Sequence, residues 1–403
     1  MASPTGEALP FSDDLLADIL IRLPTIEDLG RACASCPAFR RVITSHSFLR
    51  RLHALHPPSL LGFHTYSALF HPVEAPHPSA PAARALAEAA DFKFSFLPSP
   101  GFWMVRDAHG GRFVLDRDEG TDPTFTTIAV CDPLFRRYVL LPPIPEDLVA
   151  AVKQPVHVNP ERRCHVFFAP CSKEEAGGAP QAFSVIWMAE CPTKVVTFLF
   201  SSASGQWRAI ASARWRDLNP ACSPETKHSN LCWRSYAYGC FYWCLSGFPD
   251  HSNVIVLDIG RMEFYPVNYP FFHRFQEFAI VELEEGRRGM FMFSTNYNEG
   301  SSVLLLFSAN NQINAGGVSE WMLEKHVSLS RGYSFKMLGV ADGKLLMQGT
   351  RTGHSSSAPE FGCMSLDFKS SQLQRVRGMI HPESCPMLAQ YTGYPPSLSL
   401  PTI

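Results

Sequence analysis

Two groups of cysteine and histidine residues have spacings that could bind a metal ion or form a redox pair. The first is Cys33 and Cys36, which form a Cys-x-x-Cys pair. A structural zinc site needs four ligands, usually from two such pairs or from one pair and two histidines. No second pair follows nearby in the sequence, and the pair lies in a stretch that we expect to be helical. We therefore interpret both residues as buried thiols.

The second group consists of His228, Cys232, Cys240 and Cys244. A run of aromatic residues at positions 238–243 lies among them. Aromatic residues in close succession are typical of a β-strand, where cysteine also packs as a small apolar side chain. We expect cysteines on the face of a sheet here, so the sequence predicts no metal and no cofactor.

The sequence lacks the motifs of the common catalytic classes: the GxSxG elbow, the phosphate-binding P-loop, the Rossmann glycine pattern and HExxH. His109-Gly-Gly111 is similar to the oxyanion loop of some hydrolases. It lies between two apolar runs, however, where a pair of glycines is typical of a β-hairpin turn. We therefore predict no catalytic residues and no enzymatic activity.

Length and charge limit the class of protein. A chain of 403 residues is long enough for two or three domains. The formal net charge is -2 and the pI is about 6.7, so no overall positive field attracts nucleic acid. The longest apolar runs, at 195–200 and 303–307, are much shorter than the roughly 18 residues of a membrane helix. Without an N-terminal signal pattern, we expect a soluble protein of the cytoplasm and/or nucleus with reduced cysteines.

The spacing of the apolar residues at 9–56 predicts short helices. The first helix would begin at Ser12 or Asp13 and end at Pro24, a second would open at Thr25, and a third would begin near Pro37 and pause at 44–47. The apolar side chains of the first helix cover an arc of about 140°; they are Leu15, Leu16, Ile19, Leu20 and Leu23. This arc is wider than one small core needs, which indicates that part of it faces another protein.

Composition and periodicity divide the chain into four regions. We expect a flexible N-terminus at 1–8, the helical domain at 9–56, a Pro/Ala-rich connector at 57–91 and an all-β domain at 92–403. Groups of short strands recur in that domain every 40 to 60 residues or so, which favours a β-propeller of about six blades. A pair of β-sandwiches is the alternative. The predicted fold class is a multidomain α+β protein with three helices followed by this propeller.

Tryptophan is concentrated in the predicted β domain. All seven tryptophans lie there, at positions 103, 187, 207, 215, 233, 243 and 321. Trp207 ends a Ser-Gly-Gln-Trp turn pattern, and a large ring at such a point usually fills the space between two blades. We therefore expect these residues in the core between blades, with the target bound by loops at one end of the propeller.

Residues 9–24, LPFSDDLLADILIRLP, resemble the F-box, whose pattern is LP-x-x-LL-x-x-IL-x-RLP followed by two further helices. Asp28-Leu29 and Phe48-Leu-Arg-Arg51 resemble parts of those helices. The family usually has Lys-x-Trp-Arg in the third helix, and Phe39 takes the place of that Trp here. The remainder resembles the C-terminal, kelch/propeller-like region of plant F-box proteins in the phrases CDPLFRRYVLLPP, SSASGQWR and YAYGCFYW.

The resemblance implies a substrate-recognition subunit of an SCF-type (Skp–cullin–F-box) ubiquitin ligase. In this family the F-box docks on a Skp-type adaptor, which joins a cullin with its RING subunit, while the C-terminal domain binds the target protein. The adaptor-facing positions would be Leu9, Pro10, Leu15, Leu16, Ile19, Leu20, Leu23 and Pro24, with Leu29, Val42 and Ile43 shared with the F-box core. The charge and the short apolar runs predict no nucleic-acid or membrane partner, and the resemblance does not identify the target.

Two other functions stay open at this point. The chain could be a kelch-like propeller enzyme or a carbohydrate- or ligand-binding protein whose N-terminal helices only pack. It could also be an F-box protein that acts as a scaffold outside a ligase. The first would need convergent polar groups or a metal at a propeller mouth, and the second would bind the adaptor without assembling with a cullin.

Overall fold

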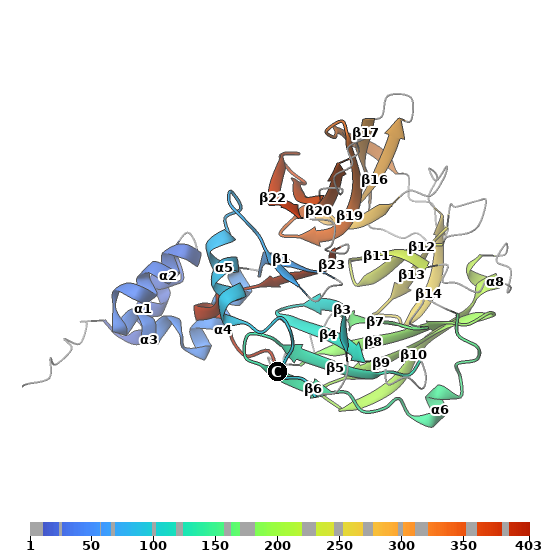
Figure 1. Ribbon diagram of the computed structural model, residues 1–403, viewed down its shortest axis with the longest axis horizontal. Helices are drawn as coiled ribbons and strands as arrows, with labels where there is room; N and C mark the ends of the chain where they lie inside the picture. Colours follow the sequence, from blue (N-terminus) through green and yellow to red (C-terminus); the bar gives the residue numbers. More distant parts are fainter. Residues whose placement is uncertain are drawn as a thin grey trace, which may run out of the picture.

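A small group of helices lies beside a ring of β-sheets in the computed structural model (Figure 1). The structure describes residues 11–23, 26–56, 58–65, 69–98, 102–117, 124–156, 163–169, 182–219, 231–245, 253–268, 277–296, 301–310, 321–351, 361–380 and 387–403. The ring carries the strands of the predicted β domain, and the helices come from the N-terminal part of the chain.

The N-terminal helices are α1 (Asp13–Leu20), α2 (Ile26–Ser35), α3 (Pro37–Ile43) and α4 (His46–Leu55). The side chain of Ser12 caps α1 by accepting a hydrogen bond from the backbone N–H of Leu15, and Ser45 caps α4 in the same way. Because Ser45 starts a new helix, the expected pause divides the third predicted helix into α3 and α4. The helical module, as we call residues 12–56, therefore has four helices where three were expected.

Five sheets of the ring have four antiparallel strands each, and in each sheet the strands follow one another in chain order. Their strands are β3 (Trp103–His109), β4 (Arg112–Arg117), β5 (Thr127–Asp132) and β6 (Arg137–Leu140); β7 (His165–Ala169), β8 (Ser184–Glu190), β9 (Lys194–Ser201) and β10 (Gln206–Arg214); β11 (Leu231–Ala237), β12 (Cys240–Leu245), β13 (Asn253–Asp258) and β14 (Glu263–Asn268); β15 (Phe278–Glu282), β16 (Arg287–Asn296), β17 (Ser301–Asn310) and β18 (Met322–Ser328); β19 (Tyr333–Ala341), β20 (Lys344–Arg351), β21 (Phe361–Asp367) and β22 (Leu373–Ile380).

The sixth sheet joins the two ends of the β region. It contains β2 (Phe70–Pro72), β1 (Ser59–Thr65) and β23 (Met387–Gly393) in that order. β1 and β23 are antiparallel, with Leu60 opposite Thr392 and Phe63 opposite Gln390. β23 also contacts β3 of the first blade and β19 of the fifth, so the ring is closed. The predicted six-bladed β-propeller is confirmed.

The structure differs from the connector that we expected at 57–91. This stretch contains β1 and β2 of the sixth blade and the helix α5 (Ala80–Ala89), which packs on both strands. Pro57, Pro58 and the alanine-rich run suggested a spacer, but Leu60, Leu61 and Phe63 of β1 are buried. A short strand of this kind is stable only when another strand pairs with it, and its partner β23 lies at the far end of the chain.

Short helices complete the fold: α6 (Glu146–Val149), α8 (Trp215–Leu218), and the 3-10 turns η1 (Glu284–Gly286) and η2 (Pro396–Leu398). Among the described residues, no helix is long and apolar enough to cross a membrane.

Apolar side chains fill the space between neighbouring blades. Trp207 of the second blade is buried with Val114 and Val130 of the first, and its indole N–H donates to Pro142 O at 2.8 Å. Trp187 lies between Phe125 and Phe198, with ring centroids 5.2 Å away on each side. The expectation of tryptophan between blades is confirmed for Trp207. This packing buries both faces of a blade, which an isolated sheet could not do.

Residues 394–403, here called the C-terminal tail, tie the helical module to the propeller. The ring of Tyr394 stacks on the ring of His53 in α4, with 3.8 Å between the ring centroids, and the Tyr394 hydroxyl donates to His56 O at 2.8 Å. Leu398 is fully buried in the core of the helical module. Further along, the backbone and side chain of Thr402 both donate to Asp132 of the first blade. The tail therefore contacts the module at one end and the propeller at the other.

We predict that Leu398→Asp weakens the attachment of the helical module. A carboxylate at this buried position loses apolar contacts and has no cationic partner, which should lower the free energy of unfolding by about 2–5 kcal/mol. Urea denaturation and limited proteolysis near residue 56 measure the effect. Ser397→Asp is the control because Ser397 is exposed. Equal stability of the two variants would contradict this account of the tail.

We also predict that mild acid destabilises the protein through three buried histidines in or near the sixth sheet. Burial lowers the pKa values of His64, His71 and His77 from 6.5 to about 4. Between pH 6.5 and pH 4 the unfolded chain therefore binds protons that the folded chain does not, so stability falls as the pH falls. Each histidine contributes up to about 1.4 kcal/mol per pH unit.

Urea denaturation at a series of pH values tests this expectation. His71→Gln removes one of the titrating groups and should make stability depend less steeply on pH between 6.5 and 5. This interval lies above the range in which ordinary carboxylates titrate. An identical slope for both chains would show that His71 does not stay neutral in the folded protein.

Candidate functional site

The helical module divides the expected adaptor-facing residues into two sets. Leu16, Leu20, Leu29, Val42 and Ile43 are buried in the core of the module. Leu15 and Ile19 are 46% and 51% exposed. Leu23 is partly buried, and Leu9, Pro10 and Pro24 lie outside the described residues. The structure thus brings the five buried residues together as a core and leaves two on the surface.

Helical geometry explains this division of α1. Leu16 and Leu20 are four residues apart and share the face that packs inward, whereas Leu15 and Ile19 share the neighbouring face. Phe11, which comes just before the capping Ser12, is also 49% exposed. We call Phe11, Leu15 and Ile19 the α1 surface. The sequence showed that the apolar arc was too wide, but it did not show which members were left over.

Two ion pairs hold α1 against the helices behind it. Arg41 of α3 is 2.7 Å from Asp13, and Arg51 of α4 is 2.7 Å from Asp18. The hydrogen bond from Arg41 holds the pKa of Asp13 below its usual value. Exposed pairs of this kind add little stability, but they connect both ends of α1 to α3 and α4. Phe39, which we expected to take the place of a tryptophan in the third helix, is partly buried against the same core.

The cysteine groups do not assemble into a metal site within the described part of the chain. No cluster of three or more His, Cys, Asp or Glu side chains occurs there with a geometry for a metal ion. Cys33 is buried in α2, and Cys36 precedes α3. Cys232 lies directly opposite Cys244 on the paired strands β11 and β12. His228 lies outside the described residues.

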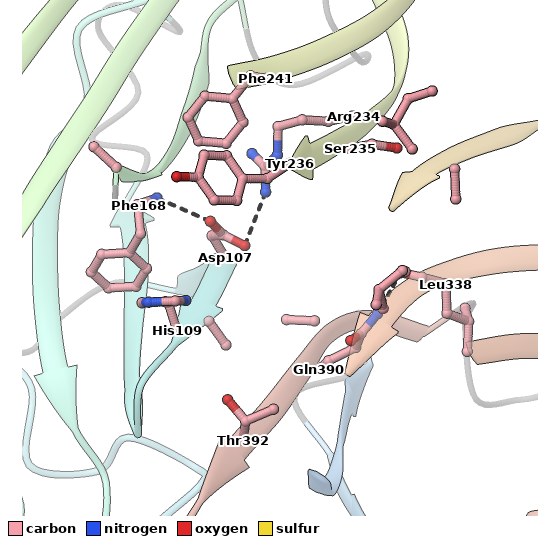
Figure 2. A pocket seen from close by; sticks show the side chains of 17 residues that line it. Asp107, His109, Phe168, Arg234, Ser235, Tyr236, Phe241, Leu338, Gln390 and Thr392 are labelled. Atoms are coloured by element: carbon pink, nitrogen blue, oxygen red, sulfur yellow. Dashed lines mark hydrogen bonds and ion pairs between the residues drawn. The ribbon is translucent and has the colours of Figure 1, made fainter. Parts of the chain in front are cut away.

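A cavity of about 350 Å³ lies in the central channel of the propeller. All six blades line it, because its residues come from the innermost strands β3, β7, β11, β15, β19 and β23, together with Phe241 of β12. Figure 2 shows Asp107 and His109 on one side of this cavity, and Leu338 and Gln390 on another. We call it the channel cavity.

An ion pair spans two blades on the wall of the channel cavity. Asp107 of β3 is 2.9 Å from Arg234 of β11, and its other carboxylate oxygen accepts from the backbone N–H of Phe168 in β7 at 2.9 Å (Figure 2). The guanidinium of Arg234 also lies 4.3 Å from the centre of the Phe167 ring. These contacts fix the direction of Arg234, and each carboxylate oxygen of Asp107 accepts one hydrogen bond.

Two titratable groups that line the channel cavity, His109 and Tyr236, are neutral near pH 7. Burial lowers the pKa of His109. Burial, with a smaller effect from Glu282, raises the pKa of Tyr236 to about 12. Asp107 is the one carboxylate among the described residues of the lining. The cavity therefore offers hydrogen bonds and one neutralised ion pair.

The turn after His109 is the β-hairpin that the sequence predicted. β3 ends at His109 and β4 begins at Arg112, so Gly110 and Gly111 form the two-residue turn. Both have positive φ, at 57° and 81°, as a hairpin turn of this type requires. The same turn places the His109 ring at the channel cavity.

Comparison with known proteins finds likeness at the level of structure. No family model matches the chain, and no curated protein matches its sequence. Similar solved structures include a xylan β-1,4-xylosidase from Bacillus halodurans (9% identity, TM-score 0.32, 68% of this chain and 55% of that one). Others are the NanB sialidase from Streptococcus pneumoniae (8%, 0.38, 75% and 65%) and the β-propeller domain of the Trilobed protease from Pyrococcus furiosus (9%, 0.35, 69% and 72%).

One expectation needs correction in this light. We expected a chain without enzymatic activity, but the structures to which it is similar are mostly glycoside hydrolases, such as the xylosidase and the sialidase. That expectation does not stand, because propellers of this kind include enzymes. Identities of 8% and 9% show the fold alone and assign no reaction to this chain. The chain spans 55% and 65% of the length of the xylosidase and the sialidase.

We predict that Asp107→Ala lowers the free energy of unfolding by about 1–3 kcal/mol. The variant leaves the Phe168 N–H and the Arg234 guanidinium without their acceptor. Urea denaturation measures the change, and Asp147→Ala, on the exposed surface of α6, is the control. If the two variants are equally stable, the ion pair does not hold the three blades together.

Proposed function

We propose that the chain is the substrate-recognition subunit of an SCF-type ubiquitin ligase. In this proposal the helical module docks on a Skp-type adaptor and, through it, on a cullin with its RING subunit. The propeller binds the target protein. The observation that carries the proposal is the α1 surface, where large apolar side chains stay exposed on a module whose core is already complete.

The exposure of these side chains favours a protein partner. Leu15 and Ile19 are about half exposed, although Leu16 and Leu20 beside them are buried. Full burial of a fully exposed side chain of this kind contributes roughly 1.5–3 kcal/mol, so covering the exposed half of each contributes about half of that per side chain. Phe11 extends the surface with an aromatic ring, a residue type that is frequent at the centre of interfaces.

The resemblance of residues 9–24 to the F-box supports a Skp-type adaptor as this partner. Leu15 and Ile19 belong to the LL and IL pairs of that pattern, and both are exposed here. Leu16 and Leu20, the other member of each pair, are buried in the core of the module. We therefore assign adaptor contact to Leu15 and Ile19, and assign Leu16 and Leu20 to the fold of the module.

The C-terminal tail suits a receptor that must hold two partners at a fixed separation. Leu398 is buried in the helical module, while Thr402 donates to Asp132 in the first blade. An adaptor on α1 and a target on the propeller would then keep one relative orientation. Ubiquitin transfer benefits from such an arrangement, because a positioned target reacts faster than one on a free tether.

Co-expression with a Skp-type adaptor tests the proposal. We expect the wild-type chain to elute with the adaptor as a stoichiometric complex in size-exclusion chromatography. Leu15→Asp with Ile19→Asp should weaken binding by about 100-fold or more, because two carboxylates would be buried without partners. Both positions are exposed in the free chain, so the thermal midpoint should change little.

Leu55→Asp is the matched control. Leu55 is another exposed leucine of the helical module, at the end of α4, and it lies outside the α1 surface. This variant should bind the adaptor like the wild type. A wild-type chain that stays folded and monomeric beside several Skp-type adaptors would refute the proposal, as would a double variant that binds normally.

A further inference from the structure

We propose that the channel cavity binds a small organic acid with a flat apolar body. The carboxylate of the ligand would pair with Arg234, and its apolar part would lie against the aromatic side chains beside it. The proposal rests on the channel cavity alone, so it stands or falls independently of adaptor binding. A volume of about 350 Å³ is within the range of pockets that hold small molecules.

Arg234 is the one cationic side chain among the described residues that line the channel cavity. Each carboxylate oxygen of Asp107 already accepts one hydrogen bond, from Arg234 on one oxygen and from the Phe168 N–H on the other. The carbonyl of Leu338 already accepts from the side-chain amide of Gln390 at 2.7 Å. Arg234 uses one terminal nitrogen for Asp107 and has further N–H groups in its guanidinium. The hydroxyl groups of Ser235, Tyr236 and Thr392 also line the cavity; they can donate as well as accept. The remaining N–H groups of Arg234 therefore suit a ligand that carries a hydrogen-bond acceptor such as a carboxylate.

Arg234 is oriented before any ligand arrives. Asp107 holds one side of its guanidinium, and the Phe167 ring lies 4.3 Å from its centre. An arginine held in this way loses little conformational entropy when it accepts a carboxylate in a two-point hydrogen bond. Asp107 cancels the net charge of the pair, so affinity would come from directed hydrogen bonds. A large anion such as a polyphosphate would find no excess positive charge here.

An aromatic wall lies beside the guanidinium. The rings of Tyr236 and Phe241 are 4.9 Å apart, and Phe168 lines the cavity below them in Figure 2. Val340 of the fifth blade, which is 40% exposed, contributes an aliphatic side chain. A flat ring can pack against such a wall, which adds apolar contact to the carboxylate interaction. Together the two features define the ligand as an aryl or similar apolar carboxylate.

Isothermal titration calorimetry with 3-phenylpropanoate tests the proposal. We expect one binding site per chain, and we expect the neutral analogue 3-phenylpropanamide to bind at least about tenfold more weakly. The two probes have nearly the same size and the same ring, so the difference reports the carboxylate. Equal binding of the acid and the amide, or no binding of the acid up to ~10 mM, would overturn the proposal.

Two variants locate the site. Arg234→Gln should weaken binding of 3-phenylpropanoate about tenfold or more, whereas Arg261→Gln, at an exposed arginine of the turn between β13 and β14, should have no effect. Val340→Phe should also weaken binding, because a larger side chain would fill part of the cavity from the fifth blade, away from the strands that carry the ion pair. If Arg234→Gln does not fold, Val340→Phe decides. Wild-type affinity in the folded variants would place the ligand elsewhere and refute the assignment.

Discussion

The antiparallel pairing of β23 with β1 closes the propeller, and the position of both candidate sites follows from it. It places Phe63 opposite Gln390 and joins the two ends of the β region in one sheet. Gln390 then reaches Leu338 of the fifth blade, and Tyr391 reaches Gly111 of the first. Without this sheet the ring would be open between the fifth and first blades. The apolar side chains of those two blades that pack against the sixth sheet would then be exposed to water.

Both candidate sites follow from the closed ring. The channel cavity takes Ala389, Gln390 and Thr392 from β23, so it is complete only when that strand is in place. The C-terminal tail starts directly after β23. Its first residue, Tyr394, contacts the helical module, and Thr402 near its end contacts Asp132 of the first blade. The orientation of the α1 surface relative to the propeller is therefore set by the same strand that closes the ring.

The two sites differ in how far the sequence could reveal them. The α1 surface was within reach, because Leu15 and Ile19 belong to a local pattern with helical spacing. Local spacing did not separate them from Leu16 and Leu20, since burial depends on where the other helices pack. The channel cavity was out of reach. Asp107 and Arg234 belong to different blades, and only His109 in its glycine turn drew attention in the sequence.

Features that depend on near neighbours along the chain could be predicted from the amino-acid sequence. Ser12 and Ser45 cap helices, Gly110 and Gly111 form a hairpin turn, and the spacing of strand groups predicts about six blades. The tertiary structure decided the rest: the pairing of β1 with β23, the course of the tail, and the partner of Arg234. Capping and turns are local hydrogen bonds and backbone preferences, whereas strand pairing and ion pairs between blades arise from contacts between distant residues, which local spacing does not encode.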